Sequence, residues 1–190
     1  KDDEKGNYVP GQQDDDDFEK VKVKPFDLAL RKFITAVSSD TEISDSEYLK
    51  DSKGNYTRVP QVDTSKLNTT GTDGKLITTA TYNHPKTPVE VNKNDVVVYM
   101  LRVYNEGEVD GYATEIKDHL PPTLEFVDGE FNTKYNWKVS EDGRTVSTDY
   151  LKESKVEKYK KDANGKIVLN YVEVPIMCKV KDTAKTDEKI

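Results

Sequence analysis

The chain has 190 residues, a length that suits one large domain or one domain with a tail. Charged residues and hydrophobic residues each make up 34%, so the apolar share lies below the roughly 45–50% typical of globular proteins and part of the chain must stay outside any core. The net charge of −7 argues against a nucleic-acid-binding protein, for which a basic patch is expected. No stretch approaches the roughly 18–20 apolar residues of a membrane span, so none is expected in this segment.

The two ends of the chain differ in composition from its middle. Residues 1–20 are polar, carry four consecutive aspartates at 14–17, and are predicted to be a disordered acidic linker. Calcium binding by these aspartates is an alternative, although the glycine and distal glutamate of an EF-hand loop are missing. Residues 181–190 are again polar and are predicted to be a linker. The ordered module is therefore expected to span residues 21–180.

Two segments carry the strongest strand signals. Residues 26–35 follow Pro25 and alternate, with Phe26, Leu28, Leu30 and Ile34 on one face. The helix-forming residues of this segment leave a helical interpretation open, but the period of two favours a strand. Residues 96–104 are apolar on both faces, as in a central strand. Between these two strands, residues 38–75 are rich in Ser, Thr, Asp, Asn and Gly and are predicted to be a long irregular insertion, with a short strand around residues 57–59.

The second half of the chain has a regular rhythm of short segments separated by Gly and Asp turns. Residues 151–161 are predicted to form a short charged helix. Strands are predicted at residues 76–82, 112–120, 124–127, 137–139, 145–148 and 167–180, the last as one long or two short strands around Pro175. Many short strands at intervals of about ten residues indicate an all-β fold, an immunoglobulin-like antiparallel β-sandwich with one long irregular insertion.

Signatures of enzymes and of metal sites are missing from the sequence. It contains no glycine-rich phosphate loop, no Gly-x-Ser-x-Gly and no His-Glu-x-x-His, so we predict that the protein is not an enzyme and uses no cofactor. The single cysteine, Cys178, excludes an internal disulfide, and alternation places it in the core. His84 and His119 lack the spacing of metal ligands, and no metal site is expected.

Lys32 and Asp118 are polar residues at positions where alternation predicts core. They could form an ion pair, their strands could be shifted so that both reach solvent, or the lysine could extend along the sheet edge to water. A covalent interpretation is also open. Full burial lowers the pKa of a lysine and raises that of an aspartic acid by up to about 3–5 units. A neutral amine is a nucleophile and a protonated carboxyl polarises an amide, so an Asn side chain nearby could form a Lys–Asn isopeptide bond with loss of ammonia.

Several stretches of the sequence resemble a repeat domain of Gram-positive cell-surface proteins, the isopeptide-forming Cna-type pilin and adhesin modules. The resemblance covers roughly residues 21–180. It rests on the strings at residues 26–34, 102–107, 110–116 and 118–121.

The resemblance implies a lysine on the first strand, an acidic residue in mid-domain and an asparagine on the last strand. Lys32 would then be the nucleophile and Asp118 the proton donor that polarises the amide. The acceptor Asn is expected in a short strand that would follow Ile190. Within the chain, Asn170 in a late strand is a candidate acceptor. A last strand missing from this segment would leave an open sheet edge, which a neighbouring module or chain could fill.

The resulting functional prediction is a structural stalk or spacer module of an extracellular, cell-wall-attached bacterial surface protein, with neighbouring modules of the same protein as its partners. The alternative is an adhesin-type module that binds a host protein or a glycan by stacking on Tyr104, Tyr112, Tyr135 and Trp137. A hydrolase is a third class, but no carboxylate spacing supports it.

Overall fold

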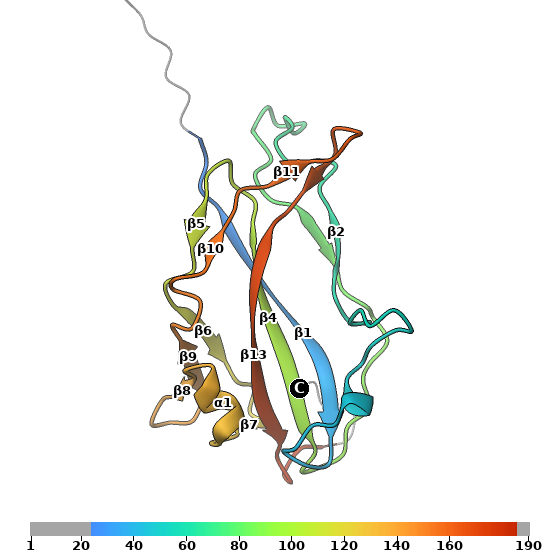
Figure 1. Cartoon of the computed structure of the whole chain (residues 1–190), viewed down its shortest axis with the longest axis vertical. Helices are drawn as coiled ribbons and strands as arrows, with labels where there is room; N and C mark the ends of the chain where they lie inside the picture. The colour runs from blue at the N-terminus through green and yellow to red at the C-terminus, as the bar shows by residue number, and fades with distance from the viewer. Residues whose placement is uncertain (1–23, 186–190) are drawn as a thin grey trace, which may run out of the picture.

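The structure, a computed structural model, describes residues 24–185 and is all-β, with antiparallel sheets (Figure 1). The main sheet has the strand order β1 (Leu28–Ser38), β4 (Val96–Asn105), β13 (Tyr171–Val180) and β7 (Leu124–Phe126). A three-stranded sheet has the order β6 (Ile116–His119), β9 (Thr145–Thr148) and β8 (Lys138–Val139). The paired short strands are β2 (Gln61–Asp63) with β3 (Thr81–Asn83), β5 (Gly111–Tyr112) with β10 (Lys155–Val156), and β11 (Lys160–Lys161) with β12 (Ile167–Val168).

Helical structure is scarce among the described residues. It consists of α1 (Glu130–Lys134) and the 3-10 turn η1 (Asp45–Glu47). In this part of the chain no helix has the length and apolar character needed to cross a membrane.

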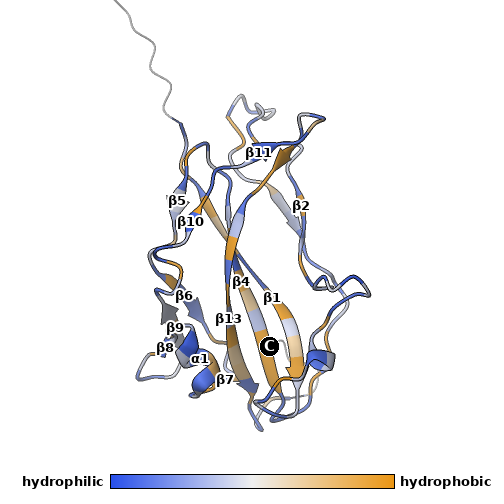
Figure 2. Cartoon of the chain, viewed as in Figure 1, coloured by the Kyte–Doolittle hydropathy of each residue, from blue (hydrophilic) through white to orange (hydrophobic). Residues whose placement is uncertain are grey.

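Strand β4 is buried along its whole length and pairs with β1 on one side and β13 on the other. Valine, tyrosine and leucine dominate it, and such side chains pack well on a pleated sheet that is covered on both faces. The prediction of a central strand at residues 96–104 is therefore confirmed, as is the strand predicted at residues 26–35. Figure 2 shows the apolar residues gathered along β1 and β4.

The principal core lies on the face of the main sheet that carries the odd-numbered residues of β4. Val97, Tyr99, Leu101 and Val103 pack there with every second residue of β13, among them the fully buried Cys178. Cys178 is thus a core residue, as alternation predicts. The residues that cover this face come from the three-stranded sheet and its flanks: Ile116, Leu120, Trp137, Val146, Leu151 and Val156.

The opposite face of the main sheet is covered by the long segment between β1 and β4. Leu67, Ala80 and Tyr82 of this segment pack around Tyr104, and Tyr48 packs near Val98. The predicted irregular insertion is thus tied down by short elements: η1, β2 and isolated bridges such as Ala36↔Tyr48. The strand expected at residues 57–59 lies instead at Gln61–Asp63, and the strand expected at residues 76–82 is limited to Thr81–Asn83.

Two further local predictions were wrong. Residues 151–161 form no helix, because Val156 is buried in the principal core and Lys155 pairs with Tyr112 as part of β10. This strand pairing with a distant segment overrides the local helix-forming tendency. Residues 112–120 are not one strand but two, β5 and β6, with a break between Tyr112 and Ile116.

Glu106, which follows β4, holds the segment between β1 and β4 against the sheet. Its side chain is almost completely buried, and its Oε1 accepts hydrogen bonds from the Ala80 amide at 2.7 Å and the Tyr82 hydroxyl at 2.9 Å. Burial raises the pKa of this carboxyl, and the two hydrogen bonds act in the opposite direction. The two hydrogen bonds offset part of the cost of burying Oε1, whereas Oε2 is buried without a hydrogen-bond partner in the described part of the chain.

Asn132 joins α1 to the main sheet. It is buried, its Nδ2 donates to the carbonyls of Val127 at 2.7 Å and Met177 at 2.8 Å, and its Oδ1 accepts from the Met177 amide at 2.9 Å. All the hydrogen-bonding groups of one buried amide side chain are therefore used to fix a five-residue helix that could not be stable alone.

We expect Asn132→Ala to lower the free energy of unfolding by about 2–4 kcal/mol, because it removes three hydrogen bonds between a buried side chain and the main chain. Denaturant unfolding measures this loss. Asn164→Ala, in an exposed turn, is the matched control and should change stability by less than about 0.5 kcal/mol. Equal effects of the two substitutions would contradict the role of the Asn132 side chain in holding α1 to the main sheet.

Candidate functional site

The structure brings together two of the three residues singled out in the sequence. Lys32 on β1 and Asp118 on β6 form an ion pair, with Nζ and Oδ2 separated by 2.8 Å. Lys32 lies opposite Leu101 in the register with β4, and Leu101 belongs to the principal core. The lysine therefore occupies the inner face of its strand, and the ion pair links the main sheet to the three-stranded sheet.

The ion pair lies at the border of the core rather than within it. The side chains of Lys32 and Asp118 retain 30% and 20% of their accessible surface. Both side chains are therefore only partly withdrawn from water. The first of the possibilities open from the sequence, an ion pair, is what the structure contains.

A tyrosine and the cysteine lie beneath the pair. Lys32 Nζ is 5.0 Å from the centre of the Tyr99 ring, close enough for a cation–π interaction. The Tyr99 hydroxyl is buried without a hydrogen-bond partner, and burial raises its pKa. Burial likewise raises the pKa of the Cys178 thiol to about 12, an effect that nearby Lys32 partly offsets. The thiol therefore stays protonated at neutral pH and is no candidate nucleophile.

The geometry of the pair suits one chemical step, the transfer of a proton from the amine to the carboxylate. An ammonium has no free electron pair, so attack on an amide requires that a proton leave Lys32 Nζ. Asp118 Oδ2 is within hydrogen-bond distance of that proton and could receive it. The arrangement therefore allows Asp118 to take up a proton from the Lys32 amine.

Asn170 is not brought to this pair. Its Nδ2 donates to the carbonyl of Lys158 at 2.7 Å, and its own carbonyl accepts from the Asn105 amide. Lys32, Leu101 and Val174 lie at the same level of the sheet. Asn170 precedes Val174 by four residues, or roughly 13 Å along an extended chain. In this structure Asn170 is not within reach of the lysine.

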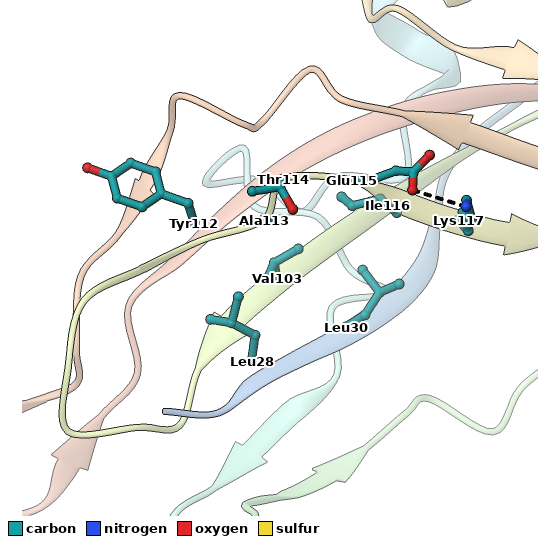
Figure 3. A pocket seen from close by; sticks show the side chains of 9 residues that line it. All are labelled: Leu28, Leu30, Val103, Tyr112, Ala113, Thr114, Glu115, Ile116 and Lys117. Atoms are coloured by element: carbon teal, nitrogen blue, oxygen red, sulfur yellow. Dashed lines mark ion pairs between the residues drawn. The ribbon is translucent and has the colours of Figure 1, made fainter. Parts of the chain in front are cut away.

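A groove of about 260 Å³ lies next to the ion pair, between β1 and the segment that contains β5 and the start of β6 (Figure 3). Leu28 and Leu30 line one wall, and Ile116 lies on the other. Leu30 lies two residues before Lys32, and Ile116 lies two residues before Asp118. Residues two apart share one face of a strand, so each wall of the groove continues into one member of the ion pair. The exposed ion pair between Glu115 and Lys117, at 3.1 Å, lies along its outer wall.

The aromatic residues considered for glycan binding do not form an exposed row. Tyr104 and Trp137 are buried, and the Trp137 Nε1 donates to the Pro175 carbonyl at 2.7 Å. Tyr135 is half-buried and packs against Tyr150. Of the four, only Tyr112 is exposed, with 49% of its surface accessible.

The histidines show no metal-binding arrangement. Within residues 24–185, no three His, Cys, Asp or Glu side chains come together in a way that could hold a metal ion. His84 and His119 are both exposed, and Nδ1 of His119 lies 3.1 Å from the Thr145 hydroxyl.

A buried cation, Arg102, was missed in the sequence. Arg102, in the middle of β4, pairs with Glu173 at 2.7 Å and stacks 3.9 Å from the centre of the Tyr171 ring. The signal in the sequence that could have revealed it is an arginine in the middle of an otherwise apolar strand. It lies on the opposite face of the sheet from Lys32, and its partners account fully for its presence.

Comparison of the chain with protein-family models, with curated proteins and with solved structures found no match. The interpretation of the site therefore rests on its geometry and on the sequence.

We expect a double-mutant cycle of Lys32→Met and Asp118→Asn to give a coupling energy of about 1 kcal/mol, because the pair is partly shielded from water. Thermal or denaturant unfolding of the four proteins measures it. The exposed pair of Glu115 and Lys117 provides the matched control cycle, and its coupling should be smaller. A coupling at Lys32 and Asp118 no larger than that of the control would show that the contact contributes nothing specific.

Proposed function

We propose that this chain is a structural stalk or spacer module of a bacterial cell-surface protein, folded as an immunoglobulin-like β-sandwich and displayed outside the cell. The observation that carries the proposal is the direction of the first and last long strands. Strands β1 and β13 both pair antiparallel with β4, so they are parallel to each other. Their common partner is the buried central strand.

This topology suits a protein that is pulled at its ends. The described chain enters at one end of the main sheet, before Leu28, and leaves at the opposite end, after Val180 (Figure 1). Tension between these points acts along the strands, whereas the hydrogen bonds that join β1 to β4 and β4 to β13 lie across them. All of these bonds resist the load together, instead of opening one at a time.

The ion pair of Lys32 and Asp118 adds a link between the two layers. In the proposed role, an Asn side chain reaching Lys32 would turn this contact into a covalent clamp. The amine of Lys32 would attack the side-chain carbonyl carbon, a C–N bond would form, and the amide nitrogen would leave as ammonia after taking up a proton through Asp118. Such a bond would limit extension much as a disulfide does, in a chain with a single cysteine.

Pulling single molecules tests the mechanical role. Handles at Lys24 and Lys185 should give an unfolding force several times higher than handles at Ser39 and Lys93. The second pair of sites is exposed and flanks the matched strand ends Ser38 and Val96, so force applied there peels β1 from β4 one residue pair at a time. Equal forces in the two geometries would refute a role that depends on shear.

Intact-mass measurement tests the covalent clamp. The 190-residue chain should have the mass calculated from its sequence, because Asn170 is held by Lys158 and Lys32 by Asp118. In any longer form of the protein in which an Asn reaches Lys32, the mass should fall by one ammonia, and Lys32→Arg or Asp118→Ala should abolish that loss. A peptide cross-linked between Lys32 and Asn170 would contradict the first expectation. An ammonia loss that persists in Lys32→Arg would contradict the second.

A further inference from the structure

In the part of the chain that the structure describes, one stretch of the main sheet has an edge without a neighbouring strand. Strand β1 is the first strand of that sheet, and the Glu106 amide donates to the Asp27 carbonyl at 2.9 Å. Because bonded and non-bonded residue pairs alternate in an antiparallel ladder, the main-chain groups of Leu28, Leu30 and Lys32 point away from β4. Within residues 24–185, the Leu30 carbonyl accepts a hydrogen bond only from a side chain of its own strand, the Arg31 guanidinium at 2.7 Å.

The other end of β1 already binds a neighbouring segment along the same edge. Ala36 forms an antiparallel bridge with Tyr48, and the Leu49 amide donates to the Thr35 carbonyl at 2.8 Å. Beyond this point the neighbouring segment turns away, since Lys50 bridges to Tyr56 instead. The open stretch at residues 28–34 therefore continues an edge at which β1 already accepts antiparallel pairing.

The groove described above runs beside this open stretch. Leu28 and Leu30 line it, and Leu30 keeps 38% of its surface accessible. Tyr112, on the opposite wall, is also exposed. The same residues thus offer outward main-chain groups and inward apolar side chains, the two features that an added strand uses.

The charges on β1 indicate the kind of strand that fits. Arg31 and Lys32 are adjacent cations. Arg31 stacks 3.8 Å from the centre of the Tyr82 ring, and among the described residues it forms no direct ion pair, although its charge acts on the buried Glu106. A second copy pairing through its own β1 would bring two such cation pairs together, which is unfavourable across strands. A strand with apolar side chains on the groove side and an acidic residue on the Arg31 side has complementary charge.

We propose that the edge of β1 at residues 28–34, together with the adjoining groove, is a docking site for an extended acidic strand of a different polypeptide. The strand adds antiparallel to β1. Its alternate apolar side chains enter the groove between Leu30 and Ile116, and its acidic residue faces Arg31. The site goes beyond the mechanical role, since it requires neither tension nor a covalent bond.

A defined peptide tests the site: a labelled, blocked peptide of alternating valine and threonine with one aspartate replacing a central threonine. Its binding to the whole chain is followed by fluorescence anisotropy. In the antiparallel pairing the valine amides face β1, so methylating the valine nitrogens should weaken binding at least about tenfold, whereas methylating the threonine nitrogens should leave it unchanged. The peptide contains no asparagine, so failure of a covalent clamp does not affect the outcome.

Protein variants complete the experiment. Leu30→Asp, at an exposed position, should abolish binding while circular dichroism and the melting temperature show a folded protein. Leu30→Pro removes one outward amide and should act in the same way, because an edge strand tolerates proline where its amide faces outward. Leu76→Asp alters another exposed leucine, outside the groove, and should bind like the unmodified protein.

Three results would overturn the proposal. The first is absence of measurable binding by the unmethylated peptide. The second is an equal loss of affinity from both methylation patterns, which would indicate contact without strand pairing. The third is a dimer of the chain, seen by light scattering and abolished by Leu30→Asp, which would make a second copy the occupant of this edge.

Discussion

The pairing of β4 with both of its neighbours is the constraint on which the rest of the structure depends. Every residue from Val96 to Asn105 is buried, and the main-chain groups of this strand are used alternately by β1 and β13. A strand in this position must be apolar on both faces, and each face then requires its own cover. One cover is the layer that contains β6 and β9, and the other is the long segment between β1 and β4.

The polar residues in and directly after β4 make hydrogen bonds that accompany this burial. Asn105 donates to the carbonyls of Val109 and Val156 and accepts from the Gly107 amide, and Glu106 accepts from two groups of the covering segment. Arg102 is neutralised by Glu173. Each is hydrogen-bonded to a group distant in sequence or to a turn, so the interior polar groups also fix where the covering segments lie.

The candidate site lies where the two layers meet at the edge of this arrangement. Lys32 lies on β1, the edge strand of the main sheet, and Asp118 lies on β6, an edge strand of the smaller sheet. An ion pair can persist there because water still reaches it, unlike a pair in the centre of the core. The groove between Leu30 and Ile116 lies beside the pair, also between β1 and the segment of β6. Both the ion pair and the groove therefore result from the position of β1 and β6 at the edges of their sheets.

The sequence by itself determined the all-β class and the strands around Lys32 and Val98. It also determined that Lys32, Asp118 and Cys178 point inward. A period of two assigns alternate side chains to opposite faces of a strand, whatever the strand pairs with. Only the tertiary structure decided which residues meet. It placed Asp118 at Lys32 and left Asn170 just before β13, four residues from Val174, which is level with Lys32. It also turned residues 151–161 from a predicted helix into strand pairs. The short strands could not be predicted with their correct bounds, since each is stabilised by hydrogen bonds to a segment distant in sequence and not by its own residues.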